Sequence, residues 1–180
     1  MTGSGNIVNE INVSKIGLIL YLDAANVLSY ASSGATTWTD LSSSGYNGTI
    51  SGTPTYDATN KAIIFSGDDY VTLPSGFSNF SNVITIATKV NLGTGDDWER
   101  IIDFGGPGAA GVLQPQVNNI LFARWATSND LAYQLYNTTS AINYKGSVAI
   151  TDNTFANYAA IQNASGITVY KNGSTVSNAL

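Results

Sequence analysis

The sequence predicts an all-β protein, an antiparallel two-sheet β-sandwich of the jelly-roll type, on three observations. Short runs rich in β-branched and aromatic residues recur along the 180 residues, with turn residues between them and no convincing amphipathic helix. Only 11% of the residues are charged, against roughly a quarter in an average domain. The pair Asn172–Gly173 separates two strand-like runs, which predicts a type I′ hairpin over Ile167–Ser177.

The N-terminal part is expected to be an arm followed by a first buried strand. Residues 1–16 are polar and contain Gly3 and Gly5, which is typical of a flexible arm or linker. The sandwich is then expected over residues 17–180, long enough for one well-buried core. Gly17–Ala24 is almost continuously apolar, which predicts a strand buried on both faces. Thr49–Ser51 is the next expected strand.

The central stretch Ala62–Leu73 is predicted to form two short strands with a corner at Gly67. Ala62–Phe65 is apolar, and Tyr70–Leu73 resumes with β-branched and aromatic residues. Gly67 permits a positive φ, and the neighbouring acids Asp68 and Asp69 favour a solvated turn.

The second half predicts a series of strands. Val83–Leu92 alternates, so that Ile84 and Ile86 share one face while Thr85 and Lys89 share the other. The glycine-rich segment Gly105–Gly111 is expected to be a flexible loop between strands. A phosphate-binding loop is not expected there, because the segment lacks the Lys-Ser/Thr pair and no helix is expected after it. The further expected strands are Arg100–Phe104, Ile120–Trp125, Leu131–Asn137, Phe155–Gln162 and Ile167–Lys171.

Composition excludes several classes of function. The net charge is −5 and the 7 basic residues are scattered singly, so nucleic-acid binding is not expected. The chain has no cysteine, which excludes disulfides and thiolate metal sites, and no histidine, the commonest general base. The N-terminal residues lack the apolar run of a signal peptide, and Gly17–Leu22 is too short to span a bilayer. We therefore expect no membrane insertion.

Three segments in order resemble the concanavalin A-like, laminin-G-like jelly-roll superfamily. They are GLILYLDAAN with WTDLSSSGYNGTI, then IIFSGDDYVTL, then ITVYKNGSTVS, and they extend from about Gly17 to Ser177. The superfamily includes lectins, glycan-binding modules, adhesive domains and virion proteins as well as some glycosidases. The opening stretch is most similar to domains of bacteriophage structural proteins.

The resemblance implies a non-catalytic phage fibre or capsid-decoration domain that adheres to host glycans at the virion surface. The alternative is an extracellular protein domain, namely a carbohydrate-binding module or lectin domain of a bacterial surface protein. Family members usually continue beyond the YKNG hairpin, whereas this chain stops at Leu180. We therefore expect either a fragment that lacks its final strands, or an open sheet edge completed by the chain itself or by other virion or surface proteins.

Catalytic glycoside hydrolysis is not expected. Enzymes that resemble this fold carry Glu-x-Asp-x-Glu on a strand, and the only glutamates here are Glu10 and Glu99. Asp97, Glu99 and Asp103 have the same strand parity, but we interpret them instead as a solvated turn followed by a solvent-facing strand edge, because surface acids rarely do chemistry without groups that perturb them. No cofactor is expected, with calcium as the one candidate.

Two candidate sites remain. Asp40, Asp68 and Asp69 lie in or beside the family-like segments and offer the oxygen ligands that calcium prefers. The alternative is that these aspartates cap turns by accepting backbone hydrogen bonds. For glycans, Trp98 is the leading contact candidate because it lies in a polar turn, and Tyr46 is the second. Trp38 and Trp125 are expected in the core.

Overall fold

The protein is seen here in a computed structural model that describes residues 16–75, 83–94, 97–105, 119–136, 141–147 and 149–178. In these ranges the regular elements are strands that pair antiparallel, which confirms the predicted all-β fold class. The same ranges contain no helix long and apolar enough to cross a membrane.

The chain divides into two compact units, Met1–Ser78 and Asn79–Leu180, and each is described by itself. Nearly all of the predicted N-terminal arm lies outside the described residues. The expectation of one sandwich over residues 17–180 stays a prediction.

The first unit contains one small sheet and one two-stranded ribbon. The sheet has the order β1-β2-β5, with β1 at Thr37–Trp38, β2 at Gly48–Ser51 and β5 at Tyr70–Thr72. The ribbon pairs β3 (Thr55–Asp57) with β4 (Ala62–Ile64). The strands expected on either side of Gly67 therefore exist, but each pairs with an earlier strand.

The strand predicted at Gly17–Ala24 is wrong, because side chains occupy the backbone groups that a ladder would use. The Tyr21 N–H donates to Asp40 Oδ1 at 2.8 Å, and the Asp23 N–H donates to Ser29 Oγ at 3.0 Å. The Tyr21 carbonyl accepts from the Leu41 N–H at 2.8 Å. The segment is irregular, and an apolar run alone could not reveal these bonds.

Aromatic side chains form a cluster in the first unit, and Phe65 is its exposed member, at 39%. Tyr30 is 4% exposed, and its ring centroid lies 6.4 Å from that of Trp38 and 5.4 Å from that of Tyr56. Phe65 stacks on Trp38 at 6.5 Å. Trp38 belongs to this cluster but is only half-buried, so the prediction that it lies in a core is not confirmed.

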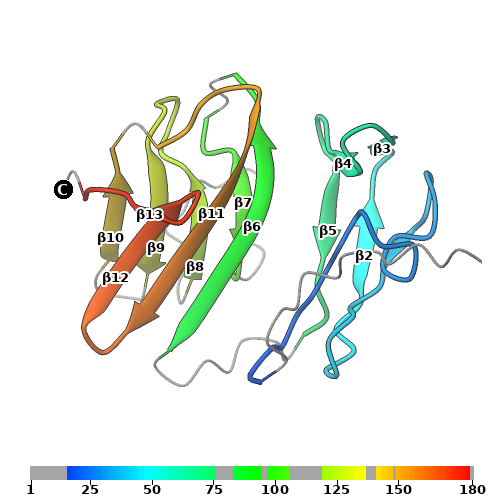
Figure 1. Ribbon diagram of the computed structural model, residues 1–180, viewed down its shortest axis with the longest axis horizontal. Helices are drawn as coiled ribbons and strands as arrows, with labels where there is room; N and C mark the ends of the chain where they lie inside the picture. Colours follow the sequence, from blue (N-terminus) through cyan, green and yellow to red (C-terminus); the bar gives the residue numbers. More distant parts are fainter. Residues whose placement is uncertain are drawn as a thin grey trace, which may run out of the picture. The chain divides into compact units, whose positions relative to one another are not determined.

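The second unit consists of two four-stranded sheets that form two layers (Figure 1). One sheet has the order β13-β12-β11-β6 and the other β10-β9-β8-β7. The strands are β6 (Ile84–Leu92), β7 (Arg100–Asp103), β8 (Asn119–Arg124), β9 (Leu131–Tyr136), β10 (Ala141–Gly146), β11 (Thr154–Asn163), β12 (Gly166–Lys171) and β13 (Ser174–Thr175).

Inward-facing side chains of both sheets build one hydrophobic core. The predicted alternation of β6 is confirmed, since Ile84 and Ile86 are buried while Thr85 and Lys89 are exposed. The buried cluster also contains Leu92, Phe122, Leu131, Tyr133, Tyr144, Ala149, Ile150, Ala156, Tyr158, Ala160 and Val169. Burial from two facing sheets is what defines a sandwich.

The C-terminal end of the second unit contains the predicted hairpin. Asn172 and Gly173 have φ of 49° and 82°, as a type I′ turn requires, and they connect β12 to β13. The chain then continues from this sheet to the other, where Asn178 forms an antiparallel bridge with Gly146 of β10. Completion of a sheet edge by another chain stays a prediction.

Candidate functional site

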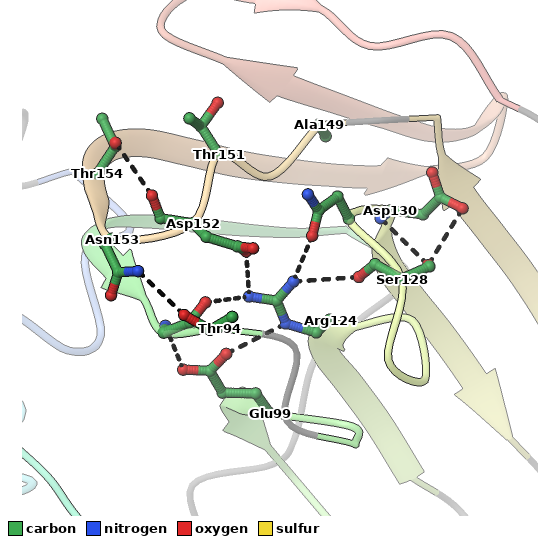
Figure 2. A network of polar contacts seen from close by, with 12 residues as sticks. Thr94, Glu99, Arg124, Ser128, Asp130, Ala149, Thr151, Asp152, Asn153 and Thr154 are labelled. Atoms are coloured by element: carbon green, nitrogen blue, oxygen red, sulfur yellow. Dashed lines mark hydrogen bonds and ion pairs between the residues drawn. The ribbon is translucent and has the colours of Figure 1, made fainter.

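The side chain of Arg124 organises one end of the second unit. Arg124 is the last residue of β8 and is 0% exposed. Each of its three guanidinium nitrogens donates to at least one acceptor (Figure 2). Nε donates to Glu99 Oε2 at 3.2 Å. The other acceptors are Ser128 O at 3.2 Å, Asn129 Oδ1 at 2.8 Å, Gly93 O at 2.7 Å and Asp152 Oδ1 at 3.0 Å. Five bonds satisfy all five guanidinium N–H donors.

These acceptors belong to three connections between strands. Residues 93–94 and 97–99 lie between β6 and β7, residues 125–130 between β8 and β9, and residues 149–153 between β10 and β11. We call these residues, with Arg124, the Arg124 rim. One buried cation therefore fixes the relative positions of three segments that are distant in sequence.

Glu99 has a different role from the one expected of it. Its Oε1 accepts the Gly93 N–H at 2.9 Å while its Oε2 binds Arg124, so both oxygens are engaged. The interpretation of this region as a solvated turn and strand edge did not include such a pair: the Glu99 side chain is 25% exposed, and its buried partner Arg124 is 25 positions away. Arg100 instead pairs with Asp103 at 3.0 Å.

Two tryptophans lie side by side on the Arg124 rim. The ring centroids of Trp98 and Trp125 are 5.4 Å apart with an interplanar angle of 46°. The Trp98 N–H donates to the Ala126 carbonyl at 3.2 Å, which joins the two connections. Trp98 and Ala126 have φ of 55° and 49°, a region that non-glycine residues rarely adopt. Such backbone strain is often found at binding sites.

Trp98 lies in a turn, as predicted, and is half-buried. Trp125 is half-buried beside it. The prediction that Trp125 lies in the core is wrong, because it follows the last residue of β8 and is already part of the rim. Lys145 on β10 covers its ring, with Nζ 5.8 Å from the centroid. The same Nζ lies 3.0 Å from Asp130 Oδ2.

The charges of the rim are largely neutralised from within. Its two cations, Arg124 and the adjoining Lys145, both have carboxylate partners. The acids Asp97, Glu99, Asp130 and Asp152 bring the local sum to −2, that is, 2 cations against 4 acids. A rim of this charge favours neutral ligands over anionic ones.

Asp40 lies in the first unit and accepts four hydrogen bonds. Its oxygens accept from the N–H groups of Tyr21, Ser42 and Tyr46, and from Ser42 Oγ at 2.7 Å. Burial acts to raise the pKa of Asp40, but these bonds outweigh it and hold the pKa below its usual value. Asp40 thus caps the turn that leads to β2.

Asp69 caps a second turn. It accepts the Ser66 N–H at 3.0 Å and the Thr53 N–H at 2.7 Å, and these bonds lower its pKa. A Cβ on Gly52 would lie 2.0 Å from Asp69 Oδ1, so glycine is required there. Asp68 is exposed, and nowhere in the described ranges do three or more acidic or imidazole groups gather as metal ligands. Calcium binding at Asp40, Asp68 and Asp69 stays a prediction.

Tyr46 also lies in the first unit. It is half-buried, and its N–H donates to Asp40 Oδ2 at 2.9 Å. Its backbone is therefore part of the Asp40 turn. The glycan contact predicted for Tyr46 stays a prediction.

Two facing antiparallel sheets around one core place the second unit in the β-sandwich class (Figure 1). A laminin G family model, described as the concanavalin A-like lectin/glucanases superfamily, matches residues 65–179, more than half of the chain. The chain belongs to this superfamily, which confirms the resemblance at that level. A search of curated proteins and a search of solved structures each found no match.

Proposed function

We propose that this chain is a non-catalytic carbohydrate-binding domain with an adhesive role, and that Trp98 and Trp125 form its sugar-binding platform. The observation that carries the proposal is the pair of half-buried indole rings at 5.4 Å, held on the rim by the bonds of Arg124. A rigid platform of this kind loses little conformational entropy when a ligand binds.

The chemistry of the platform suits a neutral sugar. The apolar C–H face of a pyranose ring packs on an aromatic face, and its hydroxyl groups need hydrogen-bonding partners at the side. Exposed Asp97, Thr127 and Asn129 supply polar groups in the same two connections. The net charge of −2 on the Arg124 rim disfavours binding of an acidic sugar to the two tryptophans.

The acids of the rim support a binding role over hydrolysis. A retaining or inverting glycosidase needs two carboxyl groups available to the scissile bond. Glu99 and Asp152 hold Arg124, and Asp130 holds Lys145. Releasing Glu99 or Asp152 for chemistry would leave a buried guanidinium short of its partners, which is costly.

For the biological setting we propose the surface of a phage virion, as part of a fibre or capsid decoration. This rests on the resemblance of the GLILYLDAAN stretch to domains of phage structural proteins. The second setting is a lectin domain of a bacterial surface protein. Neighbouring genes for capsid or tail proteins would favour the first setting, and a secretion signal on a parent chain would favour the second.

The proposal is tested by binding of the purified chain to a panel of neutral and acidic bacterial polysaccharides. We expect saturable binding of a neutral polysaccharide, weakened roughly thirtyfold by Trp98→Ala or Trp125→Ala, as for an aromatic hot spot. Tyr70→Ala is the matched control, because Tyr70 is an exposed aromatic residue (56%) in the first unit. A repeat with chelator tests the calcium prediction.

Two results would contradict the proposal. Binding that survives both tryptophan substitutions would place the sugar elsewhere on the chain. A folded sample that binds none of the polysaccharides would exclude the glycan function for this chain.

A further inference from the structure

A groove lined in part by serine and threonine side chains lies in the second unit. It shares Ala149 with the Arg124 rim but includes neither Trp98 nor Trp125. It is open to solvent and has a volume of about 510 Å³. One wall is Ser147, after β10, and the other runs from the end of β12 through β13. The polar side chains that line it are those of Ser147, Lys171, Ser174, Thr175 and Ser177.

Hydrogen bonds of the backbone and of the Asn172 side chain hold both walls of the groove. The Ser147 N–H donates to the Ser177 carbonyl at 3.1 Å and joins one wall to the other. At the hairpin tip, Asn172 accepts the Asn157 N–H through Oδ1 at 2.9 Å and donates its own N–H to the Asn157 carbonyl at 2.8 Å. Lys171, directly before this turn, therefore projects from a fixed position.

Lys171 differs from the cations of the rim in having no acidic partner within the described part of the chain. Its Nζ donates to Thr151 Oγ1 at 3.0 Å. Arg100, Arg124 and Lys145 each contact a carboxylate instead. The nearest acid in sequence to Thr151 is Asp152, which points toward Arg124 while Thr151 points the other way (Figure 2).

An ammonium group has three N–H donors, and Thr151 uses one of those on Lys171. The remaining donors are available to a ligand, beside four serine and threonine hydroxyls that both donate and accept. Half-burial of the Lys171 side chain strengthens its attraction to an anion relative to a fully exposed lysine. The chain as a whole has a net charge of −5 and repels anions, so the attraction of an anion to Lys171 acts only close to this residue.

We propose that this groove binds an acidic saccharide, with a carboxylate or sulfate of the sugar on Lys171 and sugar hydroxyls on the serine and threonine side chains. The groove is open to solvent, and the apolar side chains of Ala149 and Val176 line it beside the hydroxyl groups. This mixture suits a sugar chain, which has both hydroxyl groups and apolar C–H faces. The site goes beyond the neutral-sugar platform of the rim and does not depend on it.

The test measures binding of oligosaccharides of galacturonic acid and of sulfated galactan by calorimetry, with neutral galactan oligosaccharides and inorganic sulfate as comparison ligands. We expect the two acidic ligands to bind. Lys171→Met should weaken both roughly tenfold or more, as for the loss of a charge-assisted hydrogen bond. Lys171→Arg should retain binding, and Lys61→Met, an exposed lysine of the first unit, should leave it unchanged. Thermal unfolding checks that each variant is folded.

Trp98→Ala separates the two proposals, because it should leave acidic binding unchanged even where it abolishes neutral binding. Four outcomes would overturn the groove: no acidic ligand binds, Lys171→Met binds as well as the parent chain, Lys61→Met weakens binding equally, or sulfate alone binds as tightly as the saccharides. The last would show an anion site without a role for the hydroxyls.

Discussion

The buried guanidinium of Arg124 shows how one residue can determine the geometry of a site it does not enter. Fully desolvating a cation is unfavourable unless carboxylates and hydrogen-bond acceptors surround it. Glu99 and Asp152 supply the charges, and Gly93, Ser128 and Asn129 supply the remaining acceptors. The positions of Trp98 and Trp125 are consequences of that arrangement.

We expect Arg124→Met to lower the free energy of unfolding by about 3–5 kcal/mol, since it leaves two carboxylates without their cation at nearly constant side-chain volume. Urea unfolding followed by tryptophan fluorescence measures it. The control is Arg100→Met, because Arg100 is 51% exposed in its pair with Asp103 and should contribute less than about 1 kcal/mol. Equal losses in the two variants would contradict a structural role for the buried network.

At the residue scale the sequence identifies a polar turn but not the partners of a buried residue. Trp98 is identifiable because its neighbours are polar. Arg124 has one local signal, a charge that ends the apolar run ILFA, but its acidic partners are 25 and 28 positions away. No local pattern gives such distances, so neither the rim nor the place of Trp125 on it could be predicted.

At the scale of elements, alternation and turn chemistry predict most of the second unit. The expected strands at Val83–Leu92, Leu131–Asn137 and Phe155–Gln162 exist, and no end differs from the prediction by more than one residue. β3 and β10 were not expected, because TYD and AINYKG are short or polar and owe their pairing to neighbouring strands. The Gly17–Ala24 strand fails for the opposite reason, since side chains bind its backbone.

The β12–β13 hairpin can be tested through Asn172. We expect Asn172→Ala to reduce the free energy of unfolding by about 2 kcal/mol, because alanine is disfavoured at a φ of 49° and the bond to the Asn157 N–H is lost. Asn172→Gly loses the bond but accepts the φ, so its loss should be about 1 kcal/mol. Chemical denaturation measures both, and a glycine variant at least as destabilised as the alanine variant would contradict this division.

At the scale of the whole molecule, lowered aspartate pKa values and raised tyrosine pKa values set the acid and alkaline limits of stability. Hydrogen bonds lower the pKa of Asp40 and Asp69 below 3.8, so their contribution is present above that pH and is lost as the pH falls through the lowered values. Burial raises the pKa of Tyr133, Tyr144 and Tyr158, whose contributions are lost at the alkaline end. Tyr133, which connects the two sheets of the second unit, has a pKa raised to about 12.

Tyr133 on β9 is 0% exposed, and its hydroxyl donates to Gln162 Oε1 on β11 at 3.0 Å. Burial raises its pKa from 10.0 to about 12. The unfolded chain therefore releases this proton at a lower pH than the folded chain, so stability is complete below pH 10 and falls as the pH rises toward 12. Two pKa units correspond to about 3 kcal/mol.

We expect urea unfolding to show this loss of folding free energy between pH 10 and pH 12. The loss should be smaller in Tyr133→Phe, which lacks the ionisable hydroxyl. A Tyr133→Phe variant with the same alkaline decline as the parent chain would show that other groups determine it.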